Sequence, residues 1–309
     1  MKLDSFAKIN LYLSVRSKRK DNYHGLTTIF ERISLKDTIS VHPRKDKQIK
    51  ITSNNNGLAC DASNFVWQSV ELLRRKFNIT QGLNIRINKR VPLGSGMGGG
   101  SSNAACVLAG LNKSWNLGLS VRQLAGLGAK IGSDVPFFVY DSPFAVGRGR
   151  GEKISPEKSL KNVKLWHVIV VPGINVSTAL IYRKWDELKS LGLIPAKREL
   201  NIKKNNNCLS RLTMGKSGVK LIPLALKNND LFLLNKAIYN SLEPISESLF
   251  DEIRKVKEVF LAQGAQLIMM SGSGPAVFGI VSSKKEAVSL SRRIRKVNPF
   301  WKIFVASTC

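Results

Sequence analysis

The sequence is poor in cysteine, and its four cysteines are scattered along 309 residues at Cys60, Cys106, Cys208 and Cys309. None forms a Cys-x-x-Cys pair or a cluster with histidine, which are the spacings of structural zinc sites and disulfide frameworks. The chain also lacks an apolar run of the ~18 residues needed to span a bilayer. Its first residues hold no apolar core followed by a small-residue cleavage site, so we expect a reduced, cytoplasmic protein without membrane association.

Acidic residues are few, with 21 Asp and Glu against 49 Lys and Arg, which gives a net charge of +28. Such a charge suits a polyanionic partner, whether nucleic acid, a membrane surface or a phosphate-rich substrate. The alternative is compositional drift, because Lys, Asn and Ile are plentiful, as AT-rich coding would produce, and the basic residues are spread along the chain. No signature of an RNA-recognition motif, a KH domain or a basic helix is present, so we expect no specific nucleic-acid partner.

The length suits one large or two modest globular domains, and the 43% apolar and 23% charged residues are close to the globular average. A glycine-rich, charged stretch at 147–162 contains Pro156 and predicts a boundary between domains at 1–158 and 159–309. Strands and helices mix without a regular βαβ repeat, which indicates an α+β fold in both halves.

In the first half, the pattern of residues 5–15 alternates and predicts a half-buried strand. Its apolar face carries Ala7, Ile9, Leu11, Leu13 and Val15, whereas Lys8, Asn10 and Ser14 fall on the other face. Residues 83–91 alternate in the same way. Helices are expected at 63–77 and at 101–117, the second beginning with Ser-Ser-Asn as its cap.

In the second half we expect strands at 166–171, 266–271, 276–281 and 302–307. Helices are predicted from about residue 177, over 246–262 and over the basic segment 284–296. The apolar stripe of the second helix is Leu249, Ile253, Val256 and Phe260. The Asn-rich segment 196–220 is expected to be a mobile loop.

The densest functional signal is the glycine run PLGSGMGGGSSNAA at 92–105. Successive glycines let backbone amides approach a ligand, and the helix that follows adds its N-terminal dipole, so the segment predicts a phosphate site. No Lys follows the glycines, which excludes a Walker A loop, and no acid lies about 20 residues on, which argues against a dinucleotide site. The HRD and DFG motifs of protein kinases are absent.

This loop resembles the phosphate loop of the galactose, homoserine, mevalonate and phosphomevalonate (GHMP) kinase superfamily. Two further segments resemble the other superfamily motifs in the expected order, SFAKINL at 5–11 and SGSGPAVFG at 271–279. The resemblance implies a two-domain α+β fold, with a first half like the second domain of ribosomal protein S5 and a ferredoxin-like second half.

Further segments resemble one branch of the superfamily, the diphosphocytidyl-methylerythritol kinases of the non-mevalonate isoprenoid pathway. These segments are GGGSSNAA, DNYHGL at 21–26, IGSDVPFF at 131–138, GRGRGE at 147–152 and PGINVSTALIY at 172–182. Two positions depart from the family pattern: Phe6 replaces a proline and Asn22 replaces a glycine. The resemblance implies phosphorylation by ATP of the 2-hydroxyl of 4-diphosphocytidyl-2-C-methyl-D-erythritol, with Mg²⁺ and with a monomer or weak homodimer.

The residues expected to bind ATP form the loop itself: Pro92, Leu93, Gly94, Ser95, Gly96, Met97, Gly98, Gly99, Gly100, Ser101 and Ser102. We expect the glycine amides to hold the phosphates. The two serine hydroxyls have three possible roles, as a helix cap, a phosphate contact or a Mg²⁺ ligand, and Ser102 is the candidate for the metal.

Asp134 is the candidate catalytic carboxylate. Its neighbours are apolar, so a carboxylate at this position needs a partner. Lys8 lies on the polar face of a core-facing strand and is the natural partner. The resemblance implies that Asp134 acts as general base and that Lys8 orients it and stabilises the transferring charge. Asn10 would contact the substrate or polarise the site. The alternative is a structural ion pair or an exposed lysine. Nearby Lys8, Arg90 or Arg148 would attract the anionic nucleotide.

The resemblance implies a cytidine pocket built from Tyr23, His24 and Tyr182, in which aromatic faces sandwich the base. Ser177 or Thr178 would hold the phosphate or diol of the substrate. Two other functions remain open: a sibling kinase acting on homoserine or mevalonate, and an RNA-binding protein. The second rests on fold analogy and charge alone.

Overall fold

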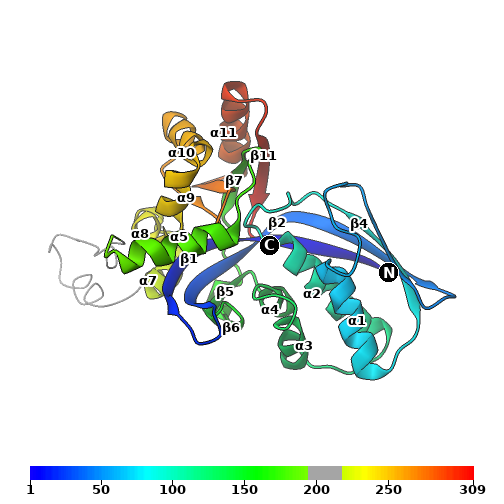
Figure 1. The fold of residues 1–309 in the computed structure, drawn as a ribbon. Helices are drawn as coiled ribbons and strands as arrows, with labels where there is room; N and C mark the ends of the chain where they lie inside the picture. Colours follow the sequence, from blue (N-terminus) through cyan, green and yellow to red (C-terminus); the bar gives the residue numbers. More distant parts are fainter. Residues whose placement is uncertain (194–217) are drawn as a thin grey trace.

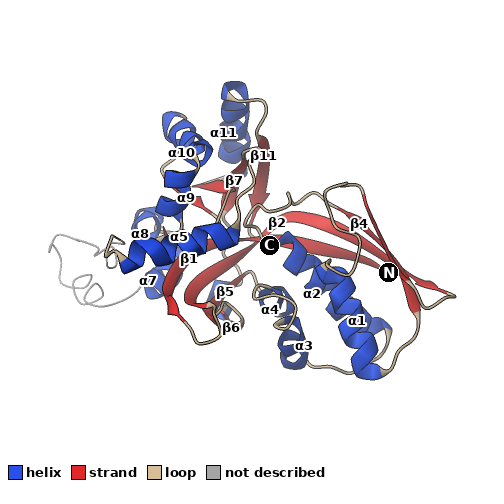
Figure 2. Ribbon diagram, viewed as in Figure 1, coloured by secondary structure: helices blue, strands red, loops and turns tan. Residues whose placement is uncertain are grey.

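The computed structural model describes residues 1–193 and 218–309, which form two β-sheets and the helices that cover them (Figures 1 and 2). Of the expected loop at 196–220, residues 196–217 lie outside the described residues, and residues 218–220 begin a helix instead. No described helix combines the length and the apolar character that crossing a membrane requires.

The first sheet has seven strands in the order β3-β4-β2-β1-β8, with β5 pairing to both β2 and β6. Two long antiparallel strands form its centre, β1 (Lys2–Lys18) and β2 (His24–Arg44). The others are β3 (Ile49–Ser53), β4 (Gly82–Asn88), β5 (Phe144–Gly149), β6 (Lys153–Pro156) and the short β8 (Tyr239–Asn240). The expected strands at 5–15 and 83–91 are confirmed.

Four helices lie along one side of this sheet (Figure 1). They are α1 (Phe65–Phe77), α2 (Gly99–Ser114), α3 (Val121–Gly128) and the single-turn α4 (Val135–Val139). The first confirms the expected helix at 63–77, and Asn64 caps it through its side chain. The second corrects the expectation of a Ser-Ser-Asn cap: α2 begins at Gly99, inside the glycine run, and Gly98 is its N-cap without a side-chain hydrogen bond.

The second sheet is antiparallel with the order β11-β7-β10-β9. Its strands are β7 (Trp166–Val171), β9 (Leu267–Met270), β10 (Val277–Val281) and β11 (Lys302–Ser307), as the sequence predicted. Helices α10 (Asp251–Ala262) and α11 (Lys284–Val297) pack on one face. Val168, Val170 and Val277 point to these helices, whereas Ile169 and Phe278 join the core shared with the first sheet.

The single helix expected over 246–262 is wrong, because the chain forms two helices there. Helix α9 (Glu243–Leu249) ends at Phe250, whose extended backbone (φ −137°, ψ 96°) breaks the run before α10 begins. Ile253, Val256 and Phe260 are buried as expected, but Leu249 belongs to the other helix and is exposed. Because of this break, the apolar face of α10 is oriented independently of α9.

The remaining elements join the two halves. A 3₁₀ turn (Lys158–Leu160) leads to β7, and α5 (Thr178–Ser190) follows it. This helix begins where the sequence predicted it, and Ser177 caps it. Helices α7 (Gly218–Lys227) and α8 (Leu231–Ala237) pack together. β8 then adds to the first sheet, parallel to β1. The predicted α+β class is confirmed, but apolar residues of both halves meet in one cluster between the sheets.

A buried hydrogen-bonded pair also links the sheets. Glu31 of β2 and His167 of β7 are fully buried, with 2.7 Å between Oε1 and Nε2, and the Thr308 hydroxyl donates to the same oxygen at 2.6 Å. His167 therefore belongs to the packing between the sheets.

We predict that Glu31→Ala lowers the free energy of unfolding by about 3–5 kcal/mol, because it leaves a buried imidazole and hydroxyl without their acceptor. Urea denaturation measures this. Glu258→Ala, at an exposed position of α10, is the control and should change stability by less than about 0.5 kcal/mol. Equal stability of the Glu31 variant and the wild type would show that the pair contributes nothing.

Candidate active site

A cavity of about 800 Å³ opens between the polar face of the β1–β2 hairpin, the glycine loop, the start of α4 and one face of α5. It brings together most of the catalytic and substrate residues that the sequence predicted. The predicted residues among its lining are Lys8, Asn10, Tyr23, His24, Gly96, Gly98, Ser101, Asp134, Thr178 and Tyr182. The whole lining extends from Lys8 to Ser273, so residues far apart in the sequence form one site.

Lys8 is at the centre of this arrangement. The alternation of β1 sends its neighbours Ala7 and Ile9 into the core and leaves the Lys8 side chain under the glycine loop, where it is 4% exposed. Its Nζ donates to the Gly96 carbonyl at 2.9 Å and to Asn10 Oδ1 at 2.7 Å. The same nitrogen lies 3.5 Å from Asp134 Oδ2. Lys8 therefore connects the strand, the loop and the carboxylate.

Asp134 stands at the first turn of α4 with its carboxylate toward the cavity. Its side chain is 32% exposed and, within the described part of the chain, takes no helix-capping hydrogen bond. A carboxylate that is held by a cation and keeps free lone pairs can accept a proton from a bound hydroxyl. Its position is compatible with the role of general base.

Asn10 completes the polar face. Its Nδ2 donates to the Thr28 hydroxyl at 2.8 Å, and Thr28 in turn donates to the Tyr12 carbonyl at 2.6 Å. This chain of hydrogen bonds fixes which atom of the amide faces Lys8.

The glycine loop adopts backbone angles that other residues rarely tolerate. Gly94, Gly96 and Gly98 have φ of 61°, 76° and 68°, in the left-handed region. Between the last two glycines, Met97 is fully buried in the core that joins the halves. Its side chain therefore anchors the loop to this core. Because Gly98 caps α2 without a side chain, the amides at the start of this helix remain available to an anion.

The second glycine turn, Ser271–Pro275, packs against the first. A Cβ on Gly96 would lie 2.2 Å from the Ser271 carbonyl oxygen. Ser271 Oγ donates to the Gly96 carbonyl at 3.1 Å, and Gly272 and Ser273 line the cavity. This turn both connects β9 to β10 and supports the phosphate loop, so the two roles considered for SGSGP coincide.

The two loop serines differ. Ser101 lines the cavity, whereas Ser102 is 1% exposed and its hydroxyl accepts a hydrogen bond from Ser5 at 2.7 Å. The buried position does not fit the metal role expected for Ser102, and neither serine caps the helix. Of the other loop residues named above, only Gly96 and Gly98 line the cavity; Ser95 donates within the loop to the Pro92 carbonyl.

A buried polar cluster lies beneath the loop, and the sequence analysis did not predict it. One carboxylate oxygen of Asp37 accepts the backbone amides of Arg90 and Val91, at 2.7 and 2.9 Å, where the chain enters the loop. The other oxygen bonds Lys89 and the Asn103 amide of α2. The side chains of Asp37, Lys89 and Asn103 are all buried. Asp37 thus ties the start of the loop to the helix that follows it, and no local pattern around Asp37 signals this.

The aromatic residues gather at the other end of the cavity. His24 and Tyr182 stack with ring centroids 4.9 Å apart, and the edge of Trp185 meets His24 at 5.3 Å. A base cannot lie between His24 and Tyr182, which corrects that part of the sandwich expected from the sequence. Burial raises the pKa of the Tyr182 hydroxyl, and the charge of Asp134 adds to the effect. The hydroxyl therefore stays protonated.

Tyr23 is half-exposed at the tip of the hairpin, with the guanidinium of Arg150 over its ring at 4.6 Å. The turn before it keeps a left-handed residue, Asn22 with φ 63°, so asparagine here serves in place of the family's glycine. The other departure, Phe6, is partly buried in β1, where Arg32 and Lys36 lie over its ring.

The basic residues of the cavity are Lys8, Lys18, Arg150 and Arg183. Arg90 and Arg148, which we expected to attract the nucleotide, do not line it. Thr178 lines the cavity and bonds Ser273 at 2.8 Å, but Ser177 is occupied as the cap of α5 and lies outside the lining. Arg150 belongs to the GRGRGE segment, so the sequence pointed to its neighbourhood.

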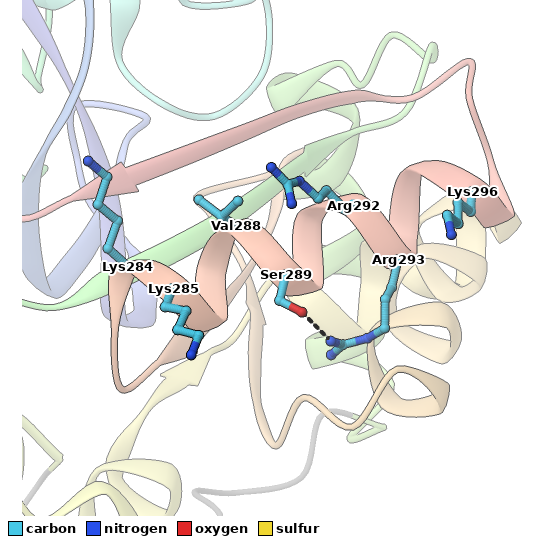
Figure 3. A pocket seen from close by; sticks show the side chains of 7 residues that line it. All are labelled: Lys284, Lys285, Val288, Ser289, Arg292, Arg293 and Lys296. Atoms are coloured by element: carbon cyan, nitrogen blue, oxygen red, sulfur yellow. Dashed lines mark hydrogen bonds between the residues drawn. The ribbon is translucent and has the colours of Figure 1, made fainter.

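A second hollow of about 740 Å³ runs along α11 (Figure 3). Five basic residues, Val288 and Ser289 line it, all from one helix. It contains neither a carboxylate nor an aromatic ring, and it shares no residue with the first cavity. The chemistry therefore belongs to the cavity around Lys8 and Asp134.

Comparison with known proteins agrees with this arrangement. Residues 64–142 match the GHMP kinases N terminal domain, and residues 224–299 match the GHMP kinases C terminal domain. The 4-diphosphocytidyl-2-C-methyl-D-erythritol kinase of Alkaliphilus metalliredigens (strain QYMF) is 39% identical over 289 residues, which are 94% of this chain and 90% of that protein.

Two solved structures resemble the whole chain. A crystal structure of 4-(cytidine 5'-diphospho)-2C-methyl-D-erythritol kinase has a TM-score of 0.76 and 28% identity, covering 99% of this chain and 98% of the other. A homoserine kinase from Cytophaga hutchinsonii has a TM-score of 0.66 and 19% identity, covering 100% and 94%. At that identity the second resemblance concerns the fold alone.

We predict that Gly96→Ala weakens ATP binding at least about tenfold, because a methyl group cannot fit against Ser271 and the left-handed backbone adds strain. Isothermal titration with ATP measures this. Gly118→Ala is the matched control: Gly118 has φ 66° but open space around it, so strain alone should leave ATP affinity unchanged. Equal affinity of both variants would contradict the close-packing argument.

Proposed function

Because the chain belongs to the 4-diphosphocytidyl-2-C-methyl-D-erythritol kinases, a family of GHMP kinases, we propose that it phosphorylates the 2-hydroxyl of that cytidine diphosphate alcohol. It is a small-molecule kinase of isoprenoid precursor biosynthesis, and ATP is its phosphate donor. We assign the active site from one observation: Lys8 and Asp134 form a pair beside the glycine loop, and the cavity around them also contains Tyr23 and Tyr182.

The Asp134 carboxylate accepts the proton of the substrate hydroxyl as its oxygen attacks the γ-phosphorus. The bond between that phosphorus and the bridging oxygen breaks, and ADP leaves. Lys8 holds Asp134 on one side and the loop on the other, so its charge lies where the transferring phosphoryl group becomes more anionic. In such a transfer, positioning and electrostatic stabilisation supply most of the rate enhancement.

The amides of the glycine loop and the first turn of α2 bind the phosphates of ATP. The loop is held in shape before ATP arrives, because Met97 anchors it in the core, Ser271 supports Gly96 and Asp37 fixes its entry. A loop that is already ordered loses little conformational entropy on binding.

Mg²⁺ requires few protein ligands, since it is commonly held by substrate phosphates, water and one or two side chains. The cavity offers the Ser101 hydroxyl and the Asp134 carboxylate, and these fit such a partial shell. No cluster of three or more metal-binding side chains occurs in residues 1–193 and 218–309. Bound there with ATP, the ion would neutralise phosphate charge.

The cytidine end of the substrate binds at the hairpin tip. Tyr23 and the free side of Tyr182 offer aromatic faces to the base, and His24 supports the Tyr182 ring from its other face. Arg150, Arg183 and Lys18 supply positive charge for the diphosphate, and the Thr178 hydroxyl lies beside the second glycine turn. Asn10 faces the reacting hydroxyl.

A sibling kinase acting on homoserine or mevalonate shares the fold but would not need an aromatic cluster opposite the catalytic pair. An RNA-binding protein would need neither the loop nor the buried Lys8. We therefore propose that the chain acts on a small molecule, without a specific nucleic-acid partner. We also propose that it acts in the cytoplasm as a monomer or weak homodimer, as the family resemblance implies.

We predict ADP release with Mg-ATP and diphosphocytidyl-methylerythritol, and none above background with homoserine, mevalonate or no acceptor. Asp134→Ala should lower turnover by about 10²–10⁴-fold, because the proton acceptor is lost, while ATP still binds. Asp251→Ala, at an exposed position of α10, is the control. Near-normal turnover of the Asp134 variant would remove this residue from the mechanism, and turnover with another alcohol only would remove the cytidine pocket.

We predict that Tyr182→Ala raises the KM for the cytidine substrate about tenfold with little change in the KM for ATP, since stacking on a base contributes about 1–3 kcal/mol. Tyr182→Phe keeps the ring and should behave like the wild type. Steady-state kinetics with each substrate varied in turn distinguish these cases. A parallel rise in both KM values would argue against base stacking.

A further inference from the structure

Asn240 connects the first sheet to the second glycine turn. It lies in β8, beside Leu13 of β1, and it is 2% exposed. Its Nδ2 donates to the carbonyls of Met270 and Gly272, each at 2.8 Å, and its Oδ1 accepts the amide of Leu242 at 2.9 Å. The reversed amide would turn its oxygen toward two carbonyl oxygens, so this orientation is fixed. The side chain therefore holds the turn at a set distance from β1.

The turn that this amide holds passes directly beside the catalytic pair. A Cβ built on Gly272 would lie 3.2 Å from the Gly96 carbonyl oxygen and 3.7 Å from Asn10 Oδ1. That Asn10 oxygen accepts the hydrogen bond of Lys8. Gly272 and Ser273 both line the cavity, so the peptide between them borders the space beside Lys8.

The hydrogen bond to Gly272 also determines where the next amide points. The peptide between Gly272 and Ser273 is trans, and in a trans peptide the carbonyl and the N–H point in opposite directions. The carbonyl points to Asn240, so the Ser273 N–H points away from it. In the part of the chain that the structure describes, no acceptor bonds this N–H. The next amide, of Gly274, differs because it donates to the Ser271 carbonyl at 3.0 Å.

We propose that the Ser273 amide donates a hydrogen bond to the transferring phosphoryl group, and that Asn240 is the positioning residue that aims it. During transfer, negative charge is spread over the equatorial oxygens of this group. A donor that is fixed beside Lys8 before the reaction stabilises this charge without reorganisation. The inference rests on the proposed function, because it concerns the same phosphoryl transfer.

A purely structural role of Asn240 would have a different consequence. The turn also supports Gly96, so an Asn240 that only held this support would, when lost, disturb the phosphate loop and weaken ATP binding. By contrast, loss of an interaction made only in the transition state lowers kcat and kcat/KM equally and leaves KM unchanged. The separate effects on kcat and on the KM for ATP therefore distinguish the two roles.

The kinetic experiment uses the full-length enzyme with Mg-ATP and the diphosphocytidyl substrate. Removing one donor from such a site costs about 10²–10³-fold in kcat, and Asn240→Ala misaligns the donor without removing it, so kcat should fall about tenfold or more. The KM for ATP should change little. An unchanged kcat, or a rise in the KM for ATP as large as the fall in kcat, would overturn the proposal.

Ser246→Ala is the matched control within the same turn. The Ser246 hydroxyl donates to the Ser273 carbonyl at 3.2 Å, and the N–H of that peptide already has its partner in Ser271. The variant removes a buried hydrogen bond to the turn but leaves the preceding peptide aligned, so kcat should remain close to that of the wild type. An equal fall of kcat in both variants would show that any loosening of the turn slows the reaction, and would overturn the specific role of Asn240.

A measurement on the wild-type protein requires neither a stable Asn240 variant nor the alcohol substrate. Labelling the glycine carbonyl carbons with ¹³C and the serine nitrogens with ¹⁵N selects, by NMR, the serine amides that follow a glycine. These are the amides of Ser95, Ser101, Ser133 and Ser273. A Ser273→Ala variant identifies the signal of Ser273.

The probe is aluminium fluoride with Mg-ADP, which mimics the planar phosphoryl group, and its ¹⁹F signal shows when it is bound. We expect the bound mimic to move the Ser273 amide proton downfield beyond its position with Mg-ADP alone. The same position in both states would overturn the inference even if the kinase activity is confirmed. Absence of turnover with the diphosphocytidyl substrate would contradict the proposed function and leave this spectrum unaffected.

Discussion

The site depends on the hydrogen bond from Lys8 to the carbonyl of Gly96. This single amine connects the central strand of the first sheet, the phosphate loop and, through Asp134, the first turn of α4. A lysine that is almost completely buried is stable only if it remains paired. The loop must therefore pass close above β1, and the carboxylate must lie beside it. The chemistry of phosphoryl transfer follows from this constraint, since base and phosphate loop are placed on either side of one cation.

The loop also joins the two halves of the chain. Met97 enters the apolar cluster between the sheets, and the turn at Ser271–Pro275 leaves no space for a side chain at Gly96. The buried pair of Glu31 and His167 and the strand β8 cross the same boundary. The two halves therefore share one core under the site, and the geometry around ATP depends on packing contributed by both.

Much of the site could be predicted from the sequence because its signals are local. The alternation along residues 5–15 predicted that Lys8 lies on the strand face opposite the apolar residues, and the glycine run predicted a phosphate loop. Most of the failures concern contacts between distant segments. Ser102 looked available but is buried against Ser5, and Asp186 and Asp37 stand in stretches without any motif. The helix expected over 246–262 failed because Phe250 interrupts it without a proline or glycine to mark the break.

The sequence by itself determined most of the periodic strands and helices, the glycine-rich loop and the family to which the chain belongs, because each depends on residues close together along the chain. Only the tertiary structure decided which polar groups meet. It placed Tyr182, Trp185 and Asp186 of α5 around His24 of β2, and it gave the cavity Arg150 in place of Arg90 and Arg148. The physical reason is that hydrogen bonds and stacking act over a few ångströms. Their partners are therefore chosen by how the sheets and helices pack, which no local pattern records.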